Sequence, residues 1–270
     1  MKSNLVIAGC LLSLMGLAAA LIIMTLSPSA ALVSVTTVSH SWYYKPTKDG
    51  SQPIVADDAD FISDYKMLYL GNAEEKIIYL TFDAGYENGY TSKILDILKE
   101  KGVTAAFFVT GHYIDSAPDL VKRMADEGHF VCNHTVNHKD LSEETSLSVF
   151  EKEIDGLAEK FKTLTGKDMP KYLRPPAGRY SESMLKIVTD MGYVPVFWSF
   201  AYKDWLTDAQ PGEAESIALI ISRTHPGEIA LLHATSSTNA AILGDLIDAW
   251  RAEGYTFKNL DELRLDVLGY

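Results

Sequence analysis

Two histidines four residues apart, His134 and His138, have the plainest potential for chemistry in this sequence. On a helical turn their imidazoles would face the same way and could share one metal ion. The pair alone is a weak signal, because exposed histidines with this spacing occur freely. A metal site needs a third donor, commonly a carboxylate, and Asp83 could supply it or act as a base nearby. Metal-assisted chemistry is therefore a hypothesis that the rest of the chain must support.

Side chains suited to catalysis follow apolar segments at five places in the chain. These places are Asp83, Asn133–His138, Arg174–Gly178, Asp204 with Trp205, and His233. In a parallel α/β sheet or barrel the carboxyl ends of the strands meet at one face. Chance could put one or two such groups there, but five in a row are difficult to explain by packing. We therefore expect these residues to converge on one site.

An alternation of apolar strands and amphipathic helices would provide that face. Strands are predicted at 77–82, 105–109, 130–132, 172–173, 194–197, 229–232 and 256–257. Helices are predicted at 91–101, 118–127, 147–164, 181–191, 213–223 and 240–253. This order implies right-handed crossovers and a parallel sheet, either open or closed into a barrel.

Length and composition limit the classes of protein to consider. The chain has 270 residues, 47% of them hydrophobic, which is enough for one large α/β core. The formal net charge of −12 makes binding to nucleic acid through its phosphates improbable, so we expect no nucleic-acid partner. The two cysteines, Cys10 and Cys132, do not indicate a disulfide framework.

The first residues have the pattern of an export signal or a membrane anchor. Lys2 precedes an uncharged run from residue 5 to 26, and small residues follow at 27–31. We expect residues 1–31 to be a signal peptide or an anchor, and the protein to be extracytoplasmic, either secreted or held at the membrane. We interpret residues 32–75 as a transition segment packed on the domain, and residues 76–270 as the catalytic domain.

The five groups resemble the ordered motifs of the polysaccharide deacetylases, carbohydrate esterases with a NodB homology domain. The motifs are Thr81–Gly85, His134–His138, Arg174–Gly178, Asp204-Trp205 and Leu231–His233. The resemblance covers about residues 65 to 265 and implies a distorted (β/α) barrel. Further likeness at residues 69–72, 81–90 and 108–112 points to the spore-cortex branch, the delta-lactam-biosynthetic de-N-acetylases.

The resemblance implies hydrolysis of an acetamide with the help of a divalent metal ion, zinc or a similar one, on His134 and His138. Such a metal lowers the pKa of a bound water and polarises the carbonyl. By the same resemblance Asp83 is the general base and the backbone amide of Ala177 stabilises the oxyanion. His233 fits the general acid that protonates the departing amine.

Other residues of the motifs fit supporting roles. Arg174 fits a partner that keeps Asp83 ionised and oriented, and Asp204 a partner that keeps His233 protonated. Trp205 and Leu231 would form the walls of the acetyl pocket.

One position departs from the family pattern. Most members have a second aspartate where this chain has Ala84, and the spore-cortex branch usually has asparagine there. Alanine cannot bind a metal. We therefore expect looser metal binding, with water or Asp83 in the vacant position.

The expected substrate is peptidoglycan, most specifically its N-acetylmuramic acid on the way to muramic delta-lactam in spore cortex. The lactyl carboxylate of muramic acid calls for a nearby cation, for which Arg179 is the candidate, although it could equally be a surface arginine. Two alternatives stay open. One is a deacetylase of N-acetylglucosamine, chitin or xylan, and the other is a non-catalytic glycan-binding module, suggested by Ala84.

Overall fold

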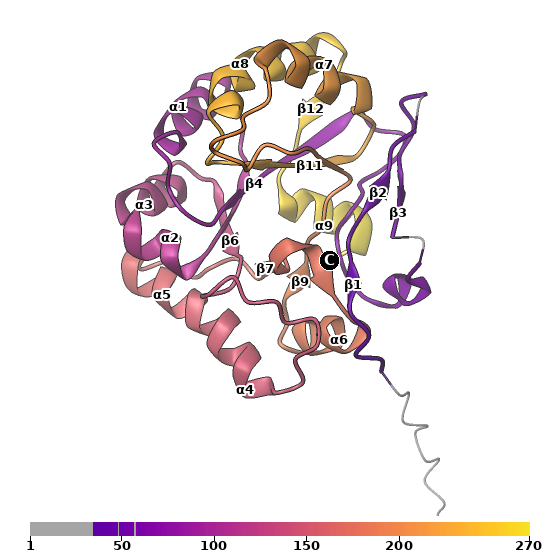
Figure 1. Ribbon diagram of the computed structural model, residues 1–270, viewed down its shortest axis with the longest axis vertical. Helices are drawn as coiled ribbons and strands as arrows, with labels where there is room; N and C mark the ends of the chain where they lie inside the picture. The colour runs from indigo at the N-terminus through magenta and orange to yellow at the C-terminus, as the bar shows by residue number, and fades with distance from the viewer. Residues whose placement is uncertain (1–34, 48, 57) are drawn as a thin grey trace, which may run out of the picture. The chain divides into compact units, whose positions relative to one another are not determined.

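The computed structural model describes residues 35–47, 49–56 and 58–270 (Figure 1). The predicted signal or anchor at residues 1–31 lies outside this part of the chain. None of the helices within the described ranges has the length and apolar character needed to cross a membrane.

A parallel sheet forms the centre of the domain. Its strands are β4 (Ile77–Ala84), β5 (Ala106–Val109), β6 (Phe130–Asn133), β7 (Tyr172–Leu173), β9 (Val194–Pro195), β10 (Phe200–Ala201), β11 (Glu228–His233) and β12 (Thr256–Phe257). The order is β10-β11-β4-β5-β6-β7-β9, and β12 pairs with the first residues of β4. Every neighbouring pair is parallel, as predicted.

The sheet forms a half-barrel, because β9 and β10 at its two edges are not paired with each other in the described structure. This arrangement is consistent with the distorted (β/α) barrel that the sequence predicts. Helices cover its outer side, with α1, α3 and α5 along one flank and α7 and α8 along another (Figure 1). They are α1 (Thr91–Lys101), α2 (Gly111–Ser116), α3 (Pro118–Asp126), α4 (Leu147–Phe150), α5 (Gly156–Thr165), α6 (Glu182–Asp190), α7 (Glu213–Arg223), α8 (Ser237–Ala252) and α9 (Leu260–Leu268).

Strand β4 shows how the sheet separates its two faces. Because successive side chains of a strand point to opposite sides, Ile78, Leu80, Phe82 and Ala84 lie in one apolar cluster with residues of α1 and α8. Ile77 and Tyr79 belong to a different cluster. Asp83 has the same alternation as this second group and therefore projects into the half-barrel, whereas Ala84 faces the covering helices.

The predicted helix 147–164 is not one continuous α-helix. A π-helical turn, η2 (Glu151–Asp155), separates α4 from α5. Periodicity alone did not indicate this turn, because its carbonyl groups bond to a loop that is distant in sequence. The Glu153 carbonyl accepts the Val136 N–H at 2.9 Å, and the Ile154 carbonyl accepts the Asn133 side-chain amide at 2.8 Å.

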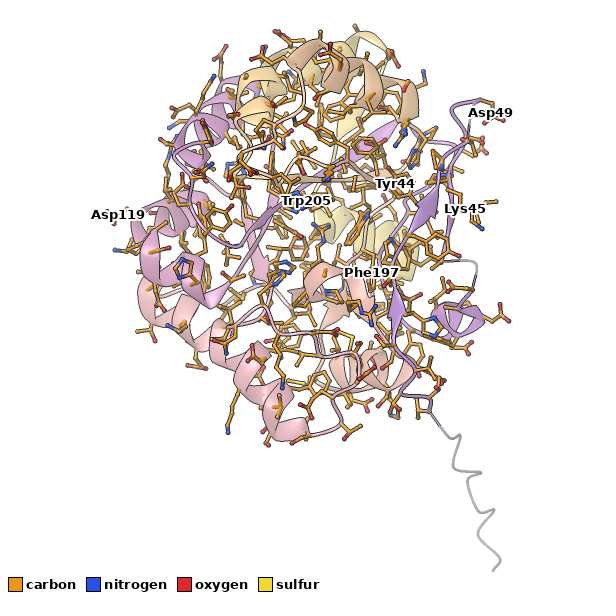
Figure 2. All side chains as sticks on the ribbon, in the orientation of Figure 1. Tyr44, Lys45, Asp49, Asp119, Phe197 and Trp205 are labelled. Carbon is orange, nitrogen blue, oxygen red and sulfur yellow. The ribbon has the colours of Figure 1, made fainter. Side chains whose placement is uncertain are left out.

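The segment before the parallel sheet packs on it through short antiparallel pairs and one tryptophan. Strand β1 (His40–Ser41) pairs with β8 (Arg179–Tyr180), and β2 (Tyr44–Lys45) pairs with β3 (Ile54–Val55). The Trp42 ring stacks on Phe197, labelled in Figure 2, with 4.3 Å between centroids. Its Nε1–H donates to the Trp198 carbonyl at 2.8 Å.

Candidate active site

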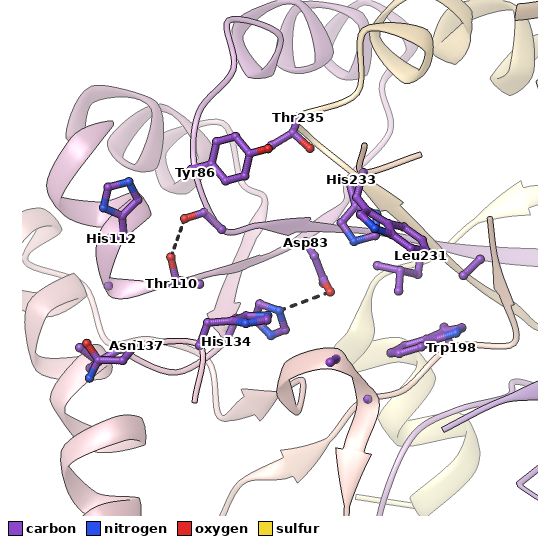
Figure 3. Close-up of a pocket in the computed structure, with 18 of the residues that line it drawn as sticks. Asp83, Tyr86, Thr110, His112, His134, Asn137, Trp198, Leu231, His233 and Thr235 are labelled. Carbon is purple, nitrogen blue, oxygen red and sulfur yellow. Dashed lines mark hydrogen bonds and ion pairs between the residues drawn. The ribbon is translucent and has the colours of Figure 1, made fainter. Parts of the chain in front are cut away.

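A pocket of about 1020 Å³ opens at the carboxyl ends of the parallel strands (Figure 3). Of the residues singled out in the sequence, Asp83, His134, His138, Ala177, Trp205, Leu231 and His233 line it. Arg174 and Asp204 are fully buried and contact two of these side chains from behind. The tertiary structure thus brings residues separated by up to 150 positions to one site.

Asp83 is held by a buried arginine. The Arg174 Nη1 donates to Asp83 Oδ1 at 2.8 Å, and its Nη2 donates to the Thr81 hydroxyl at 2.9 Å. The guanidinium also lies 4.1 Å from the centroid of the Phe108 ring. Burial by itself would raise the pKa of Asp83, but the charges of Arg174 and of the neighbouring imidazoles outweigh it and lower that pKa. Asp83 is therefore ionised at neutral pH and able to accept a proton.

His134 is fixed in one orientation and one charge state. Its Nδ1 lies 2.8 Å from the Arg174 carbonyl oxygen, so Nδ1 is the atom that carries the proton. Its Nε2 lies 3.5 Å from Asp83 Oδ2, the contact drawn as a dashed line in Figure 3. Burial lowers the pKa of His134 to about 4, so the ring is neutral at physiological pH. A neutral imidazole with a free Nε2 lone pair has the state that a metal ligand requires.

The His138 ring packs edge-on against His134, with 4.8 Å between centroids. This pair fits two ligand positions of a divalent cation, and Asp83 is a carboxylate in contact with His134. No group of three or more His, Cys, Asp or Glu side chains among the described residues is arranged as a complete metal site. Ala84, fully buried toward the helices, contributes no ligand atom. The side chains of His134, His138 and Asp83 therefore fit part of the coordination shell of a divalent cation, and other donors would fill its remaining positions.

His233 lies beside Asp83 because their strands are neighbours. In the parallel pair β11 and β4, His233 and Asp83 are register partners. The His233 Nδ1–H donates to Asp204 Oδ1 at 2.7 Å, and Asp204 Oδ2 accepts the His233 backbone N–H at 2.8 Å. Burial would lower the pKa of His233, but the hydrogen bond and charge of Asp204 raise it above its ordinary value. The site thus places a base with a lowered pKa opposite an acid with a raised pKa.

The remaining predicted residues divide into those at the pocket and one away from it. Leu231 is buried in the wall, and Trp205, labelled in Figure 2, is half-exposed with its ring 5.5 Å from that of His233. Ala177 also lines the pocket and has a left-handed φ of 52°. Arg179 is not among the lining residues. It donates to the Ser41 hydroxyl at 2.8 Å and lies 3.4 Å from Asp140.

Several pocket residues were not singled out as site residues from the sequence. They are Tyr86, Thr110, His112, Asp115, Asn137, Trp198 and Thr235, among others. Most follow a strand within a few positions, which is a signal that could have found them. His112 could be placed near the site from the sequence, but its position on α2 depends on the β5–α2 turn.

Comparisons with known proteins indicate one family. The family model described as polysaccharide deacetylase matches residues 70–196. The peptidoglycan-N-acetylmuramic acid deacetylase PdaA of Bacillus subtilis (strain 168) is 44% identical over 227 residues, which are 84% of this chain and 86% of that protein. The solved structure of B. subtilis PdaA, a family 4 carbohydrate esterase, matches with a TM-score of 0.81 and 43% identity over 85% of this chain and 98% of that one. A family 4 carbohydrate esterase from Bacillus anthracis matches with a TM-score of 0.70 and 42% identity, over 85% and 97% of the two chains.

Proposed function

This chain belongs to the polysaccharide deacetylase family and is a hydrolase of carbon–nitrogen bonds, and we propose that it removes N-acetyl groups from peptidoglycan. The specific substrate that we propose is N-acetylmuramic acid, as an early step toward muramic delta-lactam in spore cortex. Its support is the extensive identity to PdaA, whose name states that substrate. We also propose that residues 1–31 direct or anchor the domain outside the cytoplasm.

One observation supports the chemistry above all others. Asp83 and His233 are register partners on adjacent strands, and both line the pocket, where their pKa values are shifted in opposite directions. Hydrolysis of an amide needs a group that takes a proton from water and a group that gives one to the leaving nitrogen. A module that only binds glycan has no need for this pair, so the pair argues against the non-catalytic alternative.

The proposed reaction converts an acetamide and water into acetate and an amine. Asp83 accepts the proton of the attacking water, and Arg174 keeps that carboxylate ionised and oriented. The backbone amide of Ala177 stabilises the oxygen that gains negative charge. His233, held protonated by Asp204, donates its proton to the nitrogen as the carbon–nitrogen bond breaks. Leu231 and Trp205 enclose the acetyl methyl group.

Deacetylases of this family are generally metal-dependent. In this chain His134 and His138 would hold the metal, and when bound it supplies polarisation of the carbonyl and activation of water. Because Ala84 has no ligand atom, we propose that this binding is loose.

A second candidate substrate is N-acetylglucosamine, alone or in chitin-like oligomers. It lacks the lactyl carboxylate, and no lysine or arginine appears among the described residues that line the pocket. Arg179, the predicted carboxylate partner, bonds to Ser41 and lies beside Asp140 instead. His233, whose pKa is raised by Asp204, is a cationic group of the pocket lining that a muramic carboxylate could meet.

Mass spectrometry separates these candidates. Purified protein is incubated with peptidoglycan strands and divalent metal, the glycan is digested, and the sugar that has lost its acetyl group is identified. We expect deacetylated muramic acid, and no product with Asp83→Asn or His233→Ala. Loss of acetyl groups from glucosamine alone would replace the muramic assignment, and binding without acetate release would refute the proposed hydrolysis.

A further inference from the structure

A buried glutamate, Glu153, accepts hydrogen bonds from the loop that carries His134 and His138. Glu153, which is 6% exposed, lies in the π-helical turn η2. One of its carboxylate oxygens accepts the Asn137 backbone N–H at 2.9 Å, and the other accepts the Asn137 side-chain amide at 2.7 Å. The Glu153 carbonyl accepts the Val136 N–H at 2.9 Å. One residue thus makes three hydrogen bonds to two consecutive loop residues.

Two residues of this loop have left-handed backbone conformations. Thr135 has a φ of 66° and His138 a φ of 52°, in the left-handed region that residues with a side chain rarely adopt. Such conformations persist where surrounding contacts fix them. The contacts here include the bonds to Glu153, the Gly111 N–H, which donates to the Val136 carbonyl at 3.0 Å, and the Thr135 N–H, which donates to Asn133 Oδ1 at 3.0 Å.

The two imidazoles differ in how they are held. The His134 ring is fixed by its own bond to the Arg174 carbonyl. The exposed His138 side chain has a ring contact with His134 but no hydrogen bond to any of the residues described. Its position therefore depends on its backbone, which follows directly after the residue that Glu153 holds.

The π-helical turn leaves backbone carbonyl groups available to bond to the loop. In an α-helix each carbonyl bonds the N–H four residues on, whereas Gly156 donates to Glu151 across five residues. The carbonyls of Glu153 and Ile154 then accept bonds from Val136 and Asn133, on either side of His134. Turns of this kind often occur at functional sites.

We propose that Glu153 is a positioning residue that sets the place of His138 and so completes the imidazole pair for a divalent cation. This inference rests on the proposed metal-assisted function. Glu153 does not line the pocket, and its side chain contacts the loop through Asn137, which does.

Three variants test the hydrogen bonds between Glu153 and Asn137. Glu153→Ala removes both side-chain bonds, whereas Glu153→Gln can keep both if the Asn137 amide rotates to present its oxygen. Glu151→Ala is the matched control, since Glu151 is an exposed glutamate of the same turn. Two quantities are measured on the full chain: amide hydrogen exchange at residues 135–138 without added metal, and Zn²⁺ affinity by titration calorimetry.

We expect Glu153→Ala to speed exchange at these amides and to weaken Zn²⁺ binding, each at least tenfold. Glu153→Gln and Glu151→Ala should stay within about twofold of the unmodified protein. A Glu153→Ala protein that folds and keeps both values would overturn the proposal. So would a loss of thermal stability with unchanged Zn²⁺ affinity, because that result describes a purely structural residue.

A paired exchange covers the case in which Glu153→Ala does not fold. Asn137→Asp places two carboxylates together and should weaken Zn²⁺ binding, and adding Glu153→Gln should restore it, because the donor and acceptor then exchange sides. Absence of restoration contradicts the proposal. These readouts do not depend on substrate, so Glu153 can pass this test even if the chain deacetylates no glycan, and it can fail the test in an active enzyme.

Discussion

The Nδ1 atom of His233 lies 2.7 Å from Oδ1 of Asp204, a carboxylate that is completely buried. The second oxygen of Asp204 accepts the His233 backbone N–H and the Asn239 side-chain amide. This aspartate therefore fixes both the orientation of the imidazole and its charge, and it raises the pKa of His233 against the effect of burial.

Replacing Asp204 by Asn should move the alkaline limit of activity to lower pH. An acid with a raised pKa stays protonated to higher pH, so removing the cause of the increase makes His233 lose its proton earlier. We expect kcat/KM at pH 8 to fall at least tenfold, with a smaller loss near pH 5.5, because a general acid contributes about 10²–10⁴ in rate. Full pH profiles of both proteins provide the measurement.

The stability of the same variant supplies a control. The His233–Asp204 pair stabilises the fold fully below the unfolded pKa of about 6.5, and this contribution disappears as pH rises through the raised folded pKa. Urea unfolding should therefore show a larger deficit for Asp204→Asn at pH 5.5 than at pH 9. An alkaline limit that does not move would contradict the role given to Asp204.

Replacing Arg174 by Gln should destabilise the protein and abolish activity. The variant leaves Asp83 as a buried carboxylate without its cation, which costs about 3–5 kcal/mol. Because the pKa of Asp83 is lowered, its pairing contributes stability above the unfolded value of about 3.9, and that stability is lost as pH falls through the folded pKa. Urea denaturation should show the largest loss at neutral pH and a smaller one near pH 3. A double variant that also carries Asp83→Asn should regain part of the stability.

Removing the metal should abolish acetate release reversibly. His134 and His138 lack a complete set of further protein ligands among the described residues, so they should bind a cation loosely. Dialysis against a chelator is therefore expected to remove the cation without unfolding the domain. Activity should return on adding Zn²⁺ or a similar ion. His138→Ala should require at least tenfold more metal for half-maximal activity. Unchanged acetate release from protein that elemental analysis shows to be free of metal would contradict this prediction.

Tyr86 should contribute to glycan binding rather than to the chemical step. Tyr86 is 45% exposed and lines the pocket (Figure 3). Asn88 on the same loop donates its side-chain amide to the Thr235 carbonyl at 3.0 Å. An exposed aromatic ring on a fixed loop can stack on a sugar ring. We expect Tyr86→Ala to raise KM for glycan oligomers about two- to tenfold, the equivalent of about 0.5–1.5 kcal/mol, with kcat nearly unchanged.

The control for this prediction is Tyr270, which is also 45% exposed but does not line the pocket. Tyr270→Ala should leave KM as it is, and Tyr86→Phe should keep most of the affinity because it keeps the ring. A change in kcat alone for Tyr86→Ala would place this residue in the chemical step instead.

The sequence indicated the parallel α/β arrangement and singled out several residues that the structure places at the pocket. Hydrophobic periodicity is a local property, and in this chain it indicated most of the strands and covering helices, but not the edge strand β10 or the helices α2 and α9. A polar residue directly after a predicted apolar strand, such as Asp83 or His233, could be placed at the edge of the sheet where the carboxyl ends of the parallel strands meet. The pairs of Arg174 with Asp83 and of Asp204 with His233 were expected because the family resemblance gave Asp83 and His233 roles that a partner of opposite charge supports.

The tertiary structure decided what depends on contacts between distant segments. Strand register made His233 the neighbour of Asp83, and alternation along β4 turned Ala84 toward the helices. Arg179 turned away from the pocket because β8 pairs with β1, which puts Ser41 within its reach. Glu153 bonds to Asn137 from a π-helical turn whose carbonyl groups bond to residues that are distant in sequence, which no local pattern indicates. Local patterns determine which segments form, whereas the free energy of packing them together determines which side chains meet.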